Sequence, residues 1–203
     1  GITNSRSNYA TAARVAGEEA RIDGRFTLFR RALQQDGDLR NRLDEFLAAL
    51  ERAFRLEQFL EQLADLERTC SSQFRGGRFA DLEAGVRRAL DEVFGRVRAE
   101  AAAMFAPGAK RKSDFFRDVA GSRYYAHAET VGRELSLPYE ILLNIYDKSI
   151  LDVENRPPSG DLSGKFRRAL QKILAEDGGI GQQAGHLQHV IDDALDVDLE
   201  EGY

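Results

Sequence analysis

Residues 39–74, LRNRLDEFLAALERAFRLEQFLEQLADLERTCSSQF, contain no glycine or proline and repeat large apolar side chains every three or four positions. This spacing places the apolar side chains on one face of an α-helix. The face shifts in phase near Phe54, so we predict a long helix that kinks or changes its packing partner there. The apolar positions are Leu39, Leu43, Phe46, Leu47, Leu50, Phe54, Leu56, Phe59, Leu60, Leu63 and Leu66.

A second long helix is predicted over residues 78–106, after a short glycine-containing turn. Two long helices joined by a short turn should form an antiparallel hairpin. Two weaker helical segments, residues 7–22 and 25–35, precede the hairpin, and we expect them to pack across its apolar groove. We assign residues 1–106 to this subdomain. The apolar stripe of the second helix comprises Phe79, Leu82, Val86, Leu90, Val93 and Val97. Its outer row of charges, spaced for i,i+4 ion pairs, comprises Arg88, Glu92, Arg96 and Glu100.

After Pro107 the sequence predicts shorter helices. Their expected ranges are residues 113–120, 123–135, 139–153, 161 or 163 to 176, and 181–197. Ser136 is expected to cap the third of these, with Pro138 in its first turn. We assign residues 107–203 to a compact helical subdomain with an acidic end. The predicted fold class is all-α: a long antiparallel helical hairpin with N-terminal helices, plus a cluster of four to five shorter helices.

The composition is that of a globular chain without a membrane span. Of 203 residues, 42% are hydrophobic and 31% are charged, and no apolar run approaches the length of a bilayer. A single cysteine, Cys70, excludes an intrachain disulfide and a multi-cysteine metal site. The net charge of −5 is uneven, because residues 107–175 carry an excess of basic groups while residues 176–203 carry eight acidic groups and no Lys or Arg. Such an acidic end is either solvated or folds back over the basic segment.

The sequence contains no recognisable catalytic motif. It lacks a P-loop, a G-x-G-x-x-G fingerprint and a G-x-S-x-G elbow. His186, His189 and Asp193 would share one helix face, a spacing compatible with zinc, although histidines beside acidic groups on a solvated face are the commoner case. We therefore predict no catalytic residue, no metal site and no cofactor. The sequence favours a non-enzymatic protein without deciding the point.

Basic and aromatic side chains alternate between residues 110 and 125, and a second basic cluster lies near residue 168. This mixture suits an anionic surface, since cations contact charge while rings stack or are buried. In a competing interpretation, Phe115, Phe116 and one of the two tyrosines are core anchors. The predicted partner-binding residues are Lys110, Arg111, Lys112, Arg117, Arg123, Tyr124, Lys165, Arg167 and Arg168.

From these features we expect a non-enzymatic helical interaction module, an adaptor, regulator or effector that binds a protein partner. The first alternative is a nucleic-acid-binding regulator that uses the same segment, although the overall acidity argues against it. The second alternative is a small-molecule or cofactor sensor with a pocket in the C-terminal helical cluster and His127 as a polar contact. A homo-oligomer is left open. The arginine- and alanine-rich composition suggests a bacterial gene, and we expect a cytoplasmic protein or a secreted effector, with a targeting segment before Gly1 left open.

Overall fold

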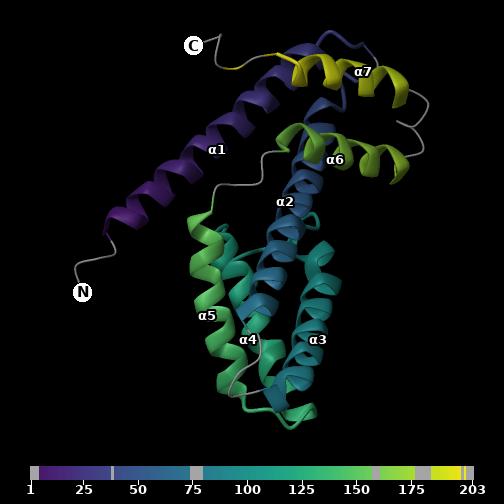
Figure 1. Cartoon of the computed structure of the whole chain (residues 1–203). Coiled ribbons are helices and arrows are strands. Elements are labelled where there is room, and N and C mark those ends of the chain that lie inside the picture. The colour runs from purple at the N-terminus through teal and green to yellow at the C-terminus, as the bar shows by residue number, and fades with distance from the viewer. Residues whose placement is uncertain are drawn as a thin grey trace. The chain divides into compact units, whose positions relative to one another are not determined.

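The computed structural model describes residues 5–37, 39–73, 80–156, 161–176, 184–197 and 199. Within these residues the chain forms seven α-helices and no strand, so the predicted all-α class is confirmed (Figure 1). None of the described helices has the length and apolarity needed to cross a membrane. The helices are α1 (Ser5–Leu33), α2 (Leu43–Gln73), α3 (Ala80–Met104), α4 (Phe116–Glu134), α5 (Tyr139–Asn155), α6 (Leu162–Glu176) and α7 (Ala184–Leu195).

Two compact units divide the chain, and α2 contributes to both. Unit 1 comprises Gly1–Glu57 and Pro157–Tyr203, and unit 2 comprises Gln58–Arg156. Unit 1 therefore contains α1, the first half of α2, α6 and α7, while unit 2 contains the rest of α2 with α3, α4 and α5. The division predicted between residues 106 and 107 falls inside unit 2. The shorter helices are shared between the units instead of forming one cluster.

An aromatic cluster forms the centre of unit 1. Phe166 of α6 is fully buried and stacks on Phe54 of α2, with 4.2 Å between ring centroids. Phe29 and Phe26 of α1 meet the same ring edge-on, with centroids 5.1 and 5.5 Å away. Edge-on and stacked aromatic pairs add stabilisation beyond the area they bury. The ring of Phe166 thus joins α6 to α1 and α2, which lie far earlier in the sequence.

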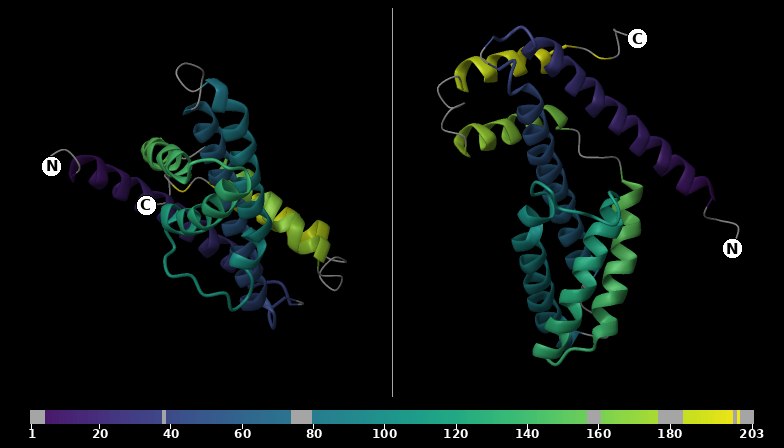
Figure 2. Two further views of the ribbon diagram at one scale, coloured as in Figure 1. Left: turned by 90° about the horizontal axis from the view of Figure 1, so that it is seen from below. Right: turned by 180° about the vertical axis from the view of Figure 1, so that it is seen from behind.

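The packing partner of α2 changes between Phe54 and Phe59, as the shifted apolar phase predicts. Phe54 packs on α6 in unit 1, whereas Phe59 lies in unit 2 against Phe105 and Phe116, with ring centroids 5.5 and 5.6 Å apart. Within unit 2 the second half of α2 runs antiparallel to α3, because Phe59 lies near Phe105 while Glu67, further along α2, pairs with Arg98, earlier on α3. Figure 2 shows α2 as one continuous helix through this change.

Glycines end fewer helices than their low helix propensity predicts. The helix α1 is continuous through Gly17 and Gly24, and α4 is continuous through Gly121. The predictions of separate helices at 7–22 and 25–35, and of separate helices at 113–120 and 123–135, are therefore wrong. A glycine inside a helix costs only about 1 kcal/mol, which tertiary packing outweighs. At Gly121 the missing side chain leaves room for the hydroxyl of Tyr146, which would lie 3.0 Å from an added Cβ.

Ser136 ends α4 and does not cap α5. It adopts a left-handed backbone with φ of 53°. The next amide, that of Leu137, donates to the carbonyl of Gly132 at 2.8 Å, and the Ser136 amide donates to Arg133 at 3.3 Å. These are the two hydrogen bonds of a Schellman C-terminal motif, with serine where glycine is usual. Pro138 itself is the N-cap of α5, without a side-chain cap.

Candidate functional site

The segment between α3 and α4 carries an exposed aromatic ring and two exposed lysines. Phe115 has 66% of its surface exposed, although the neighbouring Phe116 is partly buried against Phe59. Lys110 and Lys112 are exposed, and neither has an ion-pair partner among the residues that the structure describes. An exposed phenyl ring is costly in water, and this one lies in the same short segment as two exposed cations.

Arg111, from the same predicted set, has an intramolecular role. Its guanidinium donates to the carbonyl of Met104 at 2.8 Å and lies over the ring of Phe105, 4.5 Å from the centroid. It also approaches Asp114 at 3.3 Å. The carbonyls at a helix C-terminus lack helical partners, and a cation there satisfies one and opposes the helix dipole. Arg111 therefore fixes the segment to the end of α3.

Arg117 and Arg123 are exposed and form ion pairs within unit 2. Arg117 lies 3.5 Å from Glu154 of α5, and Arg123 lies 3.6 Å from Glu100 of α3. Partial burial raises the pKa of Glu154, with Arg117 opposing that rise. Because both guanidinium groups remain about half exposed, they keep hydrogen-bond donors available to a partner.

Tyr124 is a core residue and not a contact residue. Only 1% of it is exposed, its hydroxyl donates to the carbonyl of Leu142 at 2.7 Å, and its ring stacks on Tyr146 at 4.6 Å. Tyr146 in turn donates to the carbonyl of Arg117 at 3.1 Å. Burial raises the pKa of both phenols, so they stay neutral. Of the core anchors in the competing interpretation, Tyr124 is buried and Phe116 is partly buried, whereas Phe115 is exposed and is not a core anchor.

Tyr125 is the more accessible member of the pair. Its hydroxyl donates to Asp147 at 2.6 Å. Desolvation and this hydrogen bond raise the pKa of Tyr125 to about 12. It remains a neutral donor at physiological pH, held against Asp147 of α5.

The second predicted basic cluster belongs to unit 1 and is largely neutralised there. Lys165 is only 3% exposed and is therefore not a surface contact. Arg167 pairs with Asp192 at 2.7 Å, and Arg168 pairs with Glu57 at 3.3 Å. The first of these pairs joins α6 to α7, so a residue of the acidic end does fold back onto a basic group. The predicted surface thus draws on residues from both units.

The three histidines form pairs with carboxylates. His127 Nε2 lies 2.9 Å from Glu100, His186 Nε2 lies 3.0 Å from Asp36 of the segment after α1, and His189 Nε2 lies 3.5 Å from Asp193. Within the described ranges no group of three or more His, Cys, Asp or Glu side chains could hold a metal ion. His127 lies in an ion-pair cluster with Glu100 and Arg123 and lines neither of the hollows described next.

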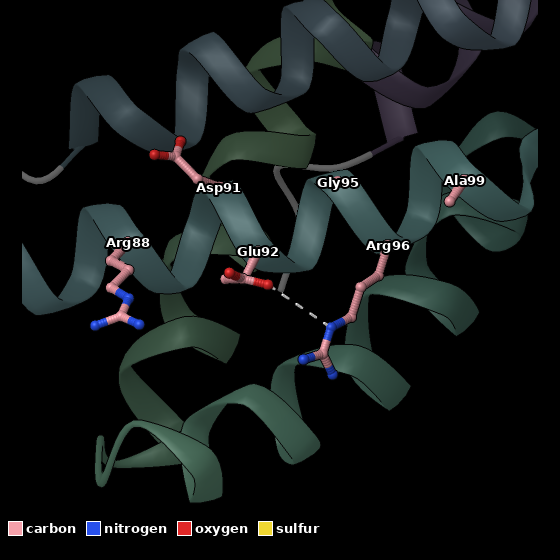
Figure 3. Close-up of a pocket in the computed structure, with 6 residues that line it drawn as sticks. All are labelled: Arg88, Asp91, Glu92, Gly95, Arg96 and Ala99. Atoms are coloured by element: carbon pink, nitrogen blue, oxygen red, sulfur yellow. Dashed lines mark ion pairs between the residues drawn. The ribbon is translucent and has the colours of Figure 1, made fainter.

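Two shallow hollows lie on the helices of unit 2. One follows the outer side of α3 alone and is lined by Arg88, Asp91, Glu92, Gly95, Arg96 and Ala99 (Figure 3). The other is lined by Ala64, Glu67, Arg68, Ser71, Ser72 and Arg87. Neither includes a residue of 107–203, where the sensor alternative requires a pocket.

The charges on the outer side of α3 pair differently from the predicted i,i+4 row. Glu92 lies 4.0 Å from Arg96, but Arg96 makes its shorter contact with Glu134 of α4, at 2.7 Å. Glu100 pairs with α4 residues instead. Arg88 and Asp91 have no ion-pair partner in the described part of the chain. The i,i+4 spacing could not indicate these contacts, because they join α3 to α4.

No family model matches this chain, and no curated protein or solved structure is detectably similar to it. The function of this chain is therefore inferred from its geometry alone.

Proposed function

We propose that the chain is a non-enzymatic protein-interaction module whose contact surface is the segment from Lys110 to Arg117. The proposal depends on one observation, the exposed ring of Phe115 in the same short segment as the exposed cations Lys110 and Lys112. Its partner is a protein segment that offers an apolar pocket rimmed by carboxylates.

The energetics favour such a partner. Fully burying a phenylalanine side chain is worth about 1.5–3 kcal/mol, and an aromatic anchor at the centre of an interface is a common hot spot. The cations around it would steer an acidic partner and fix its orientation more than they add affinity. Arg111 supports this use of the segment, since its contacts with Met104 and Phe105 fix the chain before binding.

A matched pair of variants tests the proposal. Lys110→Glu/Phe115→Ser removes one cation and the exposed ring. Lys148→Glu/Leu151→Ser makes the same kinds of change on α5, where Leu151 is 49% exposed and Lys148 is exposed. Both double variants should fold, because all four side chains are exposed.

The measurement is quantitative cross-linking in an extract of the encoding organism, followed by binding of the purified partner. We expect the wild type and the α5 variant to bind the same protein, and the Lys110→Glu/Phe115→Ser variant to lose it. Equal binding by all three proteins would refute the proposed surface.

Nucleic acid is the alternative partner for the same residues. Fluorescence anisotropy with single-stranded and duplex oligonucleotides distinguishes it, since phosphate contacts make affinity fall steeply with salt. Salt-dependent binding that disappears in the Lys110→Glu/Phe115→Ser variant would replace the protein partner with nucleic acid. The net charge of −5 favours the protein partner.

A further inference from the structure

The helix α3 has one packed face and one open face. Its packed face comprises Val86, Ala89, Leu90, Val93, Phe94, Val97, Ala101 and Met104. The open face follows the hollow of Figure 3, where Arg88 and Arg96 point toward one side of the helix axis and Asp91 toward the other. A Cβ atom added at Gly95 would meet nothing within 4 Å. The surface at Gly95 is therefore free for a second helix to approach.

The exposed positions of this face follow a heptad spacing, alternating three and four residues. They are Asp81, Ala84, Arg88, Asp91, Gly95, Arg98 and Ala102. Alternating spacing of this kind is what one helix presents to another in a coiled coil. Here the central positions are charged or small instead of large and apolar. The face can therefore remain in contact with water, and a partner helix must supply complementary charges to bind it.

We propose that this face binds the same face of a second copy of the chain, with the two α3 helices antiparallel. In this arrangement a twofold axis passes level with the midpoint between Ala89 and Leu90, and the second helix runs in the opposite direction. Arg88 then lies opposite Asp91 of the second copy. In the same alignment Ala84 lies opposite Gly95 of the second copy. Small residues facing each other let the helix axes come close, which shortens the ion pairs beside them.

A third pair of opposing positions also brings opposite charges together, because Asp81 lies opposite Arg98 of the second copy. Arg98 also pairs with Glu67 of α2 in its own chain. A guanidinium carries five N–H donors, so it can serve both carboxylates. Asp81, Arg88 and Asp91 have no ion-pair partner in the described part of their own chain. Twofold symmetry makes each of these contacts occur twice.

The charges exclude the competing arrangements. In a parallel pair in register, each residue meets its own copy, so Arg88 meets Arg88 and Asp91 meets Asp91. Moving the antiparallel partner by one heptad in one direction places Asp81 opposite Asp91. Moving it in the other direction places Arg88 opposite Arg98. Like charges that oppose each other in the wrong registers are the usual device by which helices specify orientation.

Charge reversal and charge exchange test the proposal on the full chain. Sedimentation equilibrium from about 10 µM to about 1 mM at low salt should show a weak, reversible dimer for the wild type. Arg88→Asp and Asp91→Arg each replace two attractive pairs by two repulsive ones, so each variant alone should associate at least about tenfold more weakly. Circular dichroism checks that both variants keep their helix content.

Two further samples restore the pairing. The double variant Arg88→Asp/Asp91→Arg exchanges the charges and should dimerise like the wild type. An equimolar mixture of the two single variants should form a mixed dimer, because each supplies the sign that the other needs. The Lys110→Glu/Phe115→Ser variant should keep the dimer, which separates this proposal from the proposed function.

A wild type that stays monomeric over this range would overturn the proposal. So would a dimer that both single variants retain, since the contact would then lie elsewhere. Loss of the dimer in the single variants without recovery in the exchanged variant or in the mixture would equally reject the antiparallel register.

Discussion

Replacing Tyr124 by phenylalanine and by alanine should reduce the stability of unit 2 in two steps of predictable size. The phenylalanine variant loses only the 2.7 Å hydrogen bond from the hydroxyl to the Leu142 carbonyl. A buried hydrogen bond of this kind contributes about 1 kcal/mol net. The alanine variant also loses the stacking on Tyr146 at 4.6 Å and the contact with Phe94 at 5.5 Å, and it leaves a cavity. Truncation of a buried aromatic ring to alanine costs about 3–5 kcal/mol.

Tyr9 supplies the matched control, because it is 80% exposed on α1. Its replacement by alanine should change the free energy of unfolding by no more than about 0.5 kcal/mol. The assay is urea denaturation followed by circular dichroism at the helix band, which suits a chain without tryptophan. If Tyr124→Ala costs no more than the Tyr9 control, Tyr124 is not a core residue. If that variant instead lost only partner binding, the surface role predicted from the sequence would be restored.

Five further outcomes follow from four positions. Gly95→Ala should raise stability by about 0.5–1 kcal/mol because its Cβ meets open space, whereas Gly121→Ala should lower the melting temperature because its Cβ crowds the Tyr146 hydroxyl. Ser136→Gly should raise the melting temperature by removing the left-handed strain of about 1 kcal/mol at a φ of 53°. Cys70 is buried, so iodoacetamide should label it only as urea unfolds the chain, with the same midpoint as circular dichroism. Burial raises the pKa of the Cys70 thiol from 9.0 to about 12. Between these pH values the unfolded chain has lost the thiol proton while the folded chain keeps it, so the free energy of unfolding should fall as the pH rises. The fall should be smaller in Cys70→Ala, which has no thiol.

The helices were predictable where a periodic apolar face extends over many turns. The stretch that becomes α2 contains no glycine or proline, and its apolar phase even indicated where the packing partner changes. The helix ends were less predictable. Gly24 and Gly121 looked like breaks, but each admits a neighbour that packs closely, namely Leu199 and Tyr146. Local preference is weak beside such tertiary contacts.

The position of each predicted contact residue on its helix decides whether it is buried or exposed. Tyr124 shares a face with Ala120, Ala128 and Val131, at spacings of three and four, and all four are buried. That periodicity was visible in the sequence and would have separated Tyr124 from Tyr125. Lys165 likewise lies one turn before the buried Ala169. By contrast, nothing in the sequence showed that Arg167 pairs with Asp192, because that contact joins distant segments.

The open face of α3 could not be found by a search for apolar periodicity. Its central positions are charged or small, and such a stripe is ordinarily read as solvated. Its self-complementarity appears only when the helix is compared with its own reverse. The exposure of these positions, which identifies them as one continuous face, came from the structure.

The discontinuity of unit 1 imposes an order on synthesis. Residues 58–156 form one uninterrupted stretch, so unit 2 has all its helices as soon as α5 leaves the ribosome. The aromatic cluster of unit 1 lacks Phe166 until α6 has been translated. Until then Phe26, Phe29 and Phe54 lack the ring against which all three pack. Nascent chains that pause before residue 166 should consequently contain a complete unit 2, while the N-terminal part of unit 1 is unfinished and still needs protection from aggregation.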